Sequence, residues 1–377
     1  MSTLAVNTIT NAAGGNTAQI NGMTPTAQSL QGFRNRIING NMVIDQRNAG
    51  ASVSVSSQYT LDRWYGGSTL GSKYTVQQNA GSVTPPTGFS NYLGATSSSA
   101  YAVLTGDTFW VQQSVEGFNV SDLGWGTASA QAVTLTFWVR SSLTGTFGGA
   151  FTNSATNRSY PFAYTISAAN TWEQKTITVA GDTSGTWLTT NGIGISVRFG
   201  LGSGATFSGT AGAWAAGNIV QPTGSVSVVG TNGATFYITG VQLEAGSVAT
   251  PFERRDYTRE LIMCQRYFYN QVHYMGQPAP FDNEATGAIA QSSGTAVVYR
   301  AVRVHPVEMR ATPTVTFANI EFWDGSVQRA VTTVNNNNSS KYNRSMDFNM
   351  NGNMTALGRP AYEFLRPSGF IACSAEL

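Results

Sequence analysis

Tryptophan is the residue type whose positions point most directly to a chemistry in this sequence. The chain has 8 Trp, 15 Tyr and 19 Phe, and a flat aromatic ring can stack on the apolar face of a sugar. Trp125 lies between Gly124 and Gly126, and Trp214 follows the small residues 211–213. Because neither has a bulky sequence neighbour on which to pack, we expect both rings to be exposed and to contact a glycan.

Groups that could perform catalysis are scarce. His273 and His305 are far apart in sequence, and neither a Gly-x-Ser-x-Gly nor a His-Glu-x-x-His motif occurs. A glycosidase needs two carboxylates about 5–10 Å apart, a distance that a sequence does not show. Most acidic residues of the strand-rich region adjoin turns, where Asp is ordinary. We therefore predict no catalytic residues and no enzyme, and a glycan depolymerase stays as an alternative.

Metal-ligand spacings are absent from the sequence as well. Cys264 and Cys373 are the two cysteines, and they form neither a disulfide framework nor a zinc pattern, so we expect reduced thiols. Asp107, Asp122 and Asp182 fall in expected loops and could offer oxygen ligands to a structural Ca²⁺. An Asp in a turn usually serves the turn itself. No other cofactor is predicted, and the calcium question stays open at this point.

Charge and hydropathy exclude two classes of partner. Lys and Arg number 21 against 19 Asp and Glu, a net charge of +2, which lacks the basic footprint of a nucleic-acid-binding protein. The longest apolar stretches, such as 133–139, are far shorter than the roughly 20 residues of a membrane-spanning helix. We therefore expect neither nucleic-acid binding nor membrane insertion. Residues 1–15 have neither the basic region nor the apolar run of a secretory signal, so we expect synthesis in the cytoplasm.

Strands are the elements that must position the aromatic side chains. Residues 133–139, 175–179 and 235–239 alternate apolar and polar, which is typical of an antiparallel sheet with one buried face. Trp138 lies within the first of these strands and is expected in the core. Many short strands at this spacing predict an all-β protein, with a two-sheet β-sandwich over 33–253.

Three further segments flank the predicted sandwich. Residues 254–270 have a helical period and predict a short linker helix, and residues 271–377 predict a smaller C-terminal β domain. Residues 1–32 carry no charged residue and are too few to form a core. We expect them to be an arm that orders on a neighbouring chain, and a disordered tail is the alternative.

An ordered set of sequence blocks runs from the sandwich into the helix. The blocks are RIINGNMVIDQR (36–47), YTLDRW (59–64), TFWVR (136–140), NTWEQK (170–175), GDTSGTW (181–187), ITGVQLEAG (238–246) and ATPFERR (249–255). A Tyr…Glu-Leu…Cys-x-Arg-Tyr stretch follows them, at Tyr257, Glu260, Leu261, Cys264, Arg266 and Tyr267. This set resembles phage virion proteins with a carbohydrate-binding-module-like jelly roll, which occur in tail fibres and similar appendages.

The resemblance implies several properties of the chain. It implies a jelly roll with a glycan-binding surface, a homotrimer and no catalysis, and it implies that Arg63 and the strand 240–244 are framework. Residues 2–9 are also similar to the start of phage fibre proteins, which anchor to the virion. Leu4, Val6 and Ile9 are therefore the expected virion-attachment residues.

The leading expectation is a non-enzymatic bacteriophage structural protein located on the virion. It would be a tail fibre component that attaches to other phage tail or virion proteins through residues 1–32 and binds host cell-surface polysaccharide for host attachment. The alternative is a purely structural capsid decoration, head fibre or fibre adaptor without a ligand. Location on the particle, tail or head, separates the two.

Overall fold

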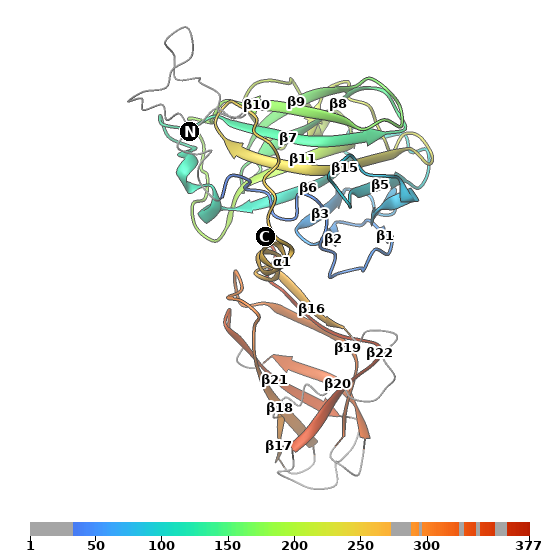
Figure 1. Cartoon of the computed structure of the whole chain (residues 1–377), viewed down its shortest axis with the longest axis vertical. Coiled ribbons are helices and arrows are strands. Elements are labelled where there is room, and N and C mark those ends of the chain that lie inside the picture. Colours follow the sequence, from blue (N-terminus) through green and yellow to red (C-terminus); the bar gives the residue numbers. More distant parts are fainter. Residues whose placement is uncertain (1–32, 273–287, 294–295, 324–327, 337–339, 351–359) are drawn as a thin grey trace, which may run out of the picture. The chain divides into compact units, whose positions relative to one another are not determined.

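The computed structural model describes six stretches of the chain, and these form two compact units. The described residues are 33–272, 288–293, 296–323, 328–336, 340–350 and 360–377 (Figure 1). The first unit consists of residues 33–43, 52–58 and 65–255, and the second of 44–51, 59–64 and the described residues from 256 onward. Two short segments inside the predicted sandwich therefore belong to the second unit. No helix among the described residues is long and apolar enough to span a membrane.

Two antiparallel sheets form the sandwich (Figure 1). The six-stranded sheet has the order β1 (Val53–Ser54), β4 (Tyr74–Gln78), β5 (Leu93–Ser97), β15 (Thr235–Ala245), β7 (Val133–Ser141) and β10 (Glu173–Val179). The seven-stranded sheet has the order β13 (Ala215–Ala216), β9 (Arg158–Ile166), β8 (Gly145–Thr152), β11 (Ile193–Ser203), β6 (Thr108–Glu116), β3 (Trp64–Ser68) and β2 (Gln58–Leu61). The strands predicted at 133–139, 175–179 and 235–239 are confirmed as parts of β7, β10 and β15.

Short elements complete the first unit. They are the 3-10 turns η1 (Ala80–Ser82), η2 (Gly117–Asn119), η3 (Ser121–Leu123) and η4 (Ala205–Phe207) and the parallel pair β12 (Ser208–Gly209) and β14 (Gln221–Pro222). They lie in the connections between the long strands. Several of these connections supply the side chains described in the next section.

An aromatic core fills the space between the two sheets. Phe137 of β7 packs edge-on against Phe199 of β11, with ring centroids 5.0 Å apart, and Phe236 of β15 stacks on Phe147 of β8 at 6.2 Å. Side chains of a strand alternate between its two faces. Because Phe137 enters the core, Trp138 lies on the outer face of the six-stranded sheet, where it is half-buried. The expectation that Trp138 is a core residue is therefore wrong.

One sheet and one helix form the second unit. The sheet has the order β16 (Phe268–Val272), β22 (Pro360–Ser374), β17 (Ala288–Ser293), β18 (Ala296–Val304), β21 (Asn343–Met350), β20 (Gln328–Asn336) and β19 (Thr314–Trp323). Helix α1 spans Tyr257–Gln265, and the Asp256 side chain caps it by accepting a hydrogen bond from Arg259 N at 2.9 Å. The predicted helix of 254–270 is thus shorter than expected, because Phe268 already starts a strand that pairs with β22.

Buried charges attach the segments 44–51 and 59–64 to the rest of the second unit. Arg63, 1% exposed, pairs with Glu376 and lies 3.5 Å above the ring of Tyr267. Arg47 pairs with the same carboxylate at 2.9 Å and lies 3.7 Å above the ring of Phe268. Arg63 therefore holds the fold together, as the resemblance implies.

The observed architecture confirms the predicted fold class. The chain is an all-β protein with a jelly-roll β-sandwich, one short helix and a smaller β unit. The predicted arm, with Leu4, Val6 and Ile9, lies outside the described residues.

Candidate functional site

The two tryptophans predicted to contact a glycan, Trp125 and Trp214, lie together with Trp187 in one group of rings, which we call the indole cluster. Their ring centroids are 5.2 Å apart, and Trp187 stands edge-on to them at 4.8 and 5.3 Å. Trp125 is only 6% exposed, so the prediction that its ring is exposed is wrong. Its sequence neighbours are small, but its packing partners come from loops far along the chain.

Hydrogen bonds to the backbone use every indole N–H of the indole cluster. The indole N–H groups of Trp125, Trp187 and Trp214 donate to the backbone carbonyls of Gln131, Ser184 and Ala180, at 2.8, 3.1 and 2.8 Å. Three loops are thereby tied together, and no indole donor is left for a ligand. Trp214 is half-buried beside the equally half-buried Tyr160, with ring centroids 5.3 Å apart. Its contact with a glycan stays a prediction.

A two-pronged ion pair joins the first residue of β9 to one of these loops. Nε and Nη2 of Arg158 donate to the two carboxylate oxygens of Asp182 at 2.8 and 2.7 Å. Burial by itself raises the pKa of Asp182, but hydrogen bonds from Arg158 and Ser184 outweigh it and hold the pKa below its usual value. The carboxylate is therefore fully used by the fold.

The other aspartates weighed as calcium ligands are engaged in the same manner. Asp122 accepts two hydrogen bonds from Arg36, at 3.1 and 2.7 Å. Asp107 accepts from the Tyr101 hydroxyl at 2.7 Å and from Leu104 N at 3.0 Å. Across the described stretches, no three His, Cys, Asp or Glu side chains gather as a metal site would require.

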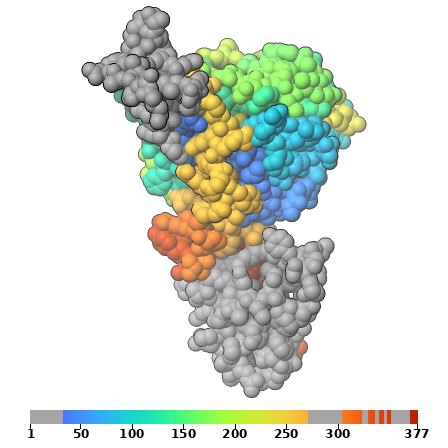
Figure 2. Space-filling model, in the orientation of Figure 1, coloured from blue at the N-terminus to red at the C-terminus, as the bar shows by residue number. Residues whose placement is uncertain are grey.

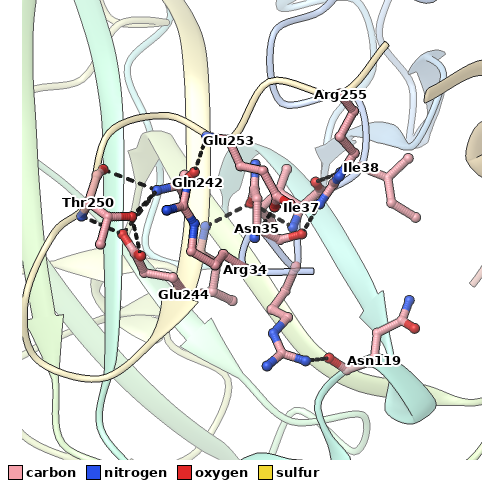
Figure 3. A network of polar contacts seen from close by, with 12 residues as sticks. Arg34, Asn35, Ile37, Ile38, Asn119, Gln242, Glu244, Thr250, Glu253 and Arg255 are labelled. Atoms are coloured by element: carbon pink, nitrogen blue, oxygen red, sulfur yellow. Dashed lines mark hydrogen bonds and ion pairs between the residues drawn. The ribbon is translucent and has the colours of Figure 1, made fainter. Parts of the chain in front are cut away.

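The most specific sequence blocks, 238–246 and 249–255, meet residues 35–37 in one polar network (Figure 3). Glu244 accepts from Thr250 N and Oγ1 at 2.9 and 2.6 Å, and the side-chain oxygen Oε1 of Gln242 accepts from Glu253 N at 2.7 Å. Asn35 N donates to the Glu253 carboxylate at 2.6 Å. In Figure 2 the gold segment around residues 250–255 lies beside the dark blue start of the described chain. Both glutamates are satisfied by the chain itself, so the network is structural.

A different group of side chains lies on the outer face of the seven-stranded sheet. Phe109 and Val111 of β6 are fully buried in the core, so Trp110 and Gln112 between and after them face outward. In β11 the register pairs Gln112 with Arg198. We call this group the outer-face cluster; its members are Trp110, Gln112, Ser114, Ser196, Arg198 and Asn218.

The ring of Trp110 lies flat on the sheet. A Cβ placed at Gly67, its neighbour on β3, would stand 2.2, 2.2 and 2.7 Å from three atoms of the indole. The ring face therefore occupies the space that the missing side chain leaves. Trp110 is half-buried, so part of its side chain is open to solvent.

One amide oxygen positions both the ring and a guanidinium. Gln112 Oε1 accepts from Trp110 Nε1 at 2.8 Å and from Arg198 Nε at 3.0 Å, and Arg198 Nη1 donates to Asn218 Oδ1 at 2.6 Å. Arg198 Cζ lies 5.4 Å from the Trp110 ring centroid. Burial lowers the pKa of Arg198 to about 10, so the guanidinium is still charged at neutral pH.

The segment 217–222 borders the outer-face cluster. Ser159 Oγ of β9 donates to Gly217 O at 2.7 Å and accepts from Ile219 N at 3.1 Å. Pro222 lies over Gly148 of β8, where a Cβ would meet its ring at 2.2 Å. The segment therefore covers part of the outer face over β8 and β9 and presents Asn218 to Arg198.

The sequence analysis missed this cluster. Its signal was the alternation in 108–116, TFWVQQSVE, in which polar side chains occupy every position on one face beside a single Trp. Arg198 stands likewise between two apolar residues of a strand. No local pattern indicates that β6 and β11 are neighbours, because the two strands are far apart in sequence.

Comparison with known proteins yields distant structural likenesses only. No protein-family model and no curated protein matches the sequence. The chain is similar to the enzymatically active domain of tailspike protein 4 of bacteriophage CBA120, at 13% identity and a TM-score of 0.31 over 57% of this chain and 22% of that one. It thus spans less than a quarter of the tailspike chain.

Carbohydrate-binding modules also resemble the sandwich. The family 11 module from Clostridium thermocellum, solved with a β-1,3-1,4-mixed-linked tetrasaccharide, has 12% identity and a TM-score of 0.27 over 53% of this chain and 98% of the module. The module TmCBM61, solved with β-1,4-galactotriose, has 11% identity and a TM-score of 0.29 over 56% of this chain and 99% of the module. All these TM-scores lie below 0.5, and we infer no function from them.

Proposed function

We propose that the protein binds carbohydrate at the outer-face cluster of its sandwich. The observation that carries the proposal is Trp110, a half-buried ring that packs over Gly67 on the outer face of the seven-stranded sheet. A sugar offers an apolar face to such a ring and hydroxyl groups to polar side chains at the ring edge. Gln112 stands at that edge and is hydrogen-bonded to Arg198, which in turn is hydrogen-bonded to Asn218, so both kinds of contact are provided in one place.

The proposed site includes no catalytic step. None of the described residues that make up the outer-face cluster is a carboxylate. Glu116, on the same face of β6 two residues beyond Ser114, is a single carboxylate that is 1% exposed, and glycoside hydrolysis commonly requires two. Ring and amide contacts also need no metal or cofactor. We therefore propose a binding protein and not an enzyme.

The biological setting is proposed from the ordered sequence blocks. They support a tail fibre component on a phage virion, homotrimeric, attached to other tail or virion proteins by residues 1–32 and in contact with host cell-surface polysaccharide. In this setting the outer-face cluster would recognise the host glycan.

Glycan-array binding by the full-length protein tests the proposed site, with two variants compared. Trp110→Ala is expected to weaken binding of the best glycan about tenfold or more, as for other central aromatic contacts. Trp138→Ala is the matched control, because Trp138 is also half-buried but lies on the outer face of the opposite sheet. Circular dichroism verifies that both variants are folded.

Two results would overturn the proposed site. Loss of binding in Trp138→Ala with retention in Trp110→Ala would move the site to the six-stranded sheet. A folded wild-type protein that binds no glycan would instead favour the alternative, a capsid decoration, head fibre or fibre adaptor without a ligand.

A further inference from the structure

Three arginines are buried among the described residues, and one of them differs from the others. Arg36 pairs with Asp122, and Arg63 pairs with Glu376. Arg198, 6% exposed, has no carboxylate partner; its donors reach the neutral oxygens of Gln112 and Asn218. The sandwich therefore holds one buried cation without a counter-charge.

A buried cation without a counter-charge is costly. Transfer of a charged group from water into the protein costs several kcal/mol of free energy. Only a partner of opposite charge with good hydrogen bonds offsets this cost fully. Two amide oxygens supply partial charges only. Arg198 thus carries an electrostatic cost that an anion placed beside it would relieve.

The guanidinium also has donors left for such an anion. Nε and Nη1 are engaged, whereas Nη2 of Arg198 bonds to no described residue. Nη1 keeps a second hydrogen as well, and the planar fork of arginine matches the two oxygens of a carboxylate. A second unsatisfied group lies next to the cluster: Gln221 Oε1, over Gly200 beside Trp110, has no hydrogen-bond donor among the described residues.

The spacing within the cluster suits one sugar unit. Arg198 Cζ lies 5.4 Å from the Trp110 ring centroid, so a pyranose stacked on the ring can extend a directly attached carboxylate to the guanidinium. Gln112 holds the two groups in this relation by accepting from both. A neutral sugar would stack equally well but would leave Arg198 without a counter-charge.

We propose that the glycan recognised at the outer-face cluster is acidic, with a uronic-acid unit whose ring stacks on Trp110 and whose carboxylate pairs with Arg198. This inference rests on the proposed glycan-binding function and adds the class of ligand. It also assigns Arg198 as the residue that determines specificity.

Matched acidic and neutral oligosaccharides test the inference on the full-length protein. The probes are oligogalacturonate, oligomannuronate and hyaluronan oligosaccharides, each with its carboxyl-reduced counterpart, and a sulfated galactan. Calorimetry or surface plasmon resonance is expected to show that at least one acidic probe binds about tenfold or more tightly than its reduced form, as for charge-assisted hydrogen bonds. That preference is expected to weaken with added salt.

Two substitutions assign the preference to Arg198. Arg198→Gln is expected to bind the acidic and reduced forms alike. Arg140→Gln is the matched control: Arg140 also lies beside an aromatic ring, 5.5 Å from the Tyr237 centroid, and donates to a neutral oxygen, Asn170 O, but it belongs to the opposite sheet. Its variant is expected to keep the wild-type preference.

The outcomes separate the two proposals. Equal binding of acidic and reduced probes by the wild type would overturn the acidic-glycan inference and leave the proposed glycan-binding function standing. Binding of the sulfated galactan alone would overturn the carboxylate assignment. If Trp110→Ala bound glycans as tightly as the wild type, the proposed site itself would be overturned.

Discussion

The indole cluster of Trp125, Trp187 and Trp214 and the outer-face cluster around Trp110 use the same side-chain types with opposite results. In the indole cluster each indole N–H reaches a backbone carbonyl, and the adjacent Arg158 has a two-pronged carboxylate partner. In the outer-face cluster Arg198 has only amide oxygens as hydrogen-bond partners, and Trp110 is only half-buried. A binding site is thus distinguished by what the fold leaves unsatisfied, and less by residue type.

The two clusters differ because of the elements that build them. Loops form the indole cluster, and a loop backbone, which is not fixed by a strand register, can adopt a conformation in which its polar groups are hydrogen-bonded. Adjacent strands form the outer-face cluster, where the register sets which side chains are neighbours. A sheet face therefore presents its side chains without closing over them, except where a segment such as 217–222 crosses it.

The largest difference between the clusters should appear when a ring is removed. Trp125→Ala is expected to lower the free energy of unfolding by about 3–5 kcal/mol, because a buried Trp leaves a cavity. Trp110→Ala should cost far less stability and mainly lose glycan affinity. Chemical denaturation followed by circular dichroism measures both, and an unchanged transition in Trp125→Ala would show that the indole cluster is not structural.

Removal of a carboxylate should separate a buried ion pair from an exposed one. Asp182→Asn is expected to destabilise the sandwich by about 2 kcal/mol, since it breaks charge-assisted hydrogen bonds to Arg158. Glu308→Gln is the control, because Glu308 and its partner Lys341 have side chains that are 44% and 43% exposed, and such pairs contribute about 0–1 kcal/mol. Thermal and denaturant unfolding measure the difference. Equal effects of the two substitutions would contradict this explanation.

Replacement of Arg198 should not lower the free energy of unfolding, in contrast to replacement of Asp182. Arg198→Met is expected to leave the free energy of unfolding unchanged or to raise it by about 1 kcal/mol, because a buried charge without a counter-charge is replaced by an apolar side chain. The same denaturation experiment measures it. A loss comparable to that of Asp182→Asn would mean that Arg198 is a structural residue.

The smallest expected difference is in acid. The pKa of Asp182 in the folded protein is lowered from the ordinary value of 3.8. Its contribution to stability is therefore complete above that value and is lost as the pH falls from there through the folded-state pKa. Asp182→Asn should show a flatter decrease in stability over this acid range, whereas Arg198→Met should follow the wild type. Unfolding midpoints measured at a series of acidic pH values test this.

Much of the fold followed from local sequence patterns. Alternation located the strands that became β7, β10 and β15, because a period of two is a property of neighbouring residues. The helix was located too, although it ends earlier than its period suggested. Phe268 and the residues after it pair with β22, and this pairing partner is distant in sequence.

The exposure of individual rings did not follow from local patterns. Trp125 between two glycines had the sequence context of an exposed ring, and Trp138 in an apolar strand had that of a core ring; the structure reverses both. Trp187 and Trp214 cover Trp125, and Phe137 takes the core position beside Trp138.

The sequence alone thus determined the all-β class, the strands and the scarcity of catalytic groups, since these depend on composition and on neighbouring residues. Only the tertiary structure decided that Trp110 and Arg198 meet on one sheet face and that no carboxylate joins them. The physical reason is that burial and charge compensation are set by residues far apart in the chain, which come together only when the strands pair.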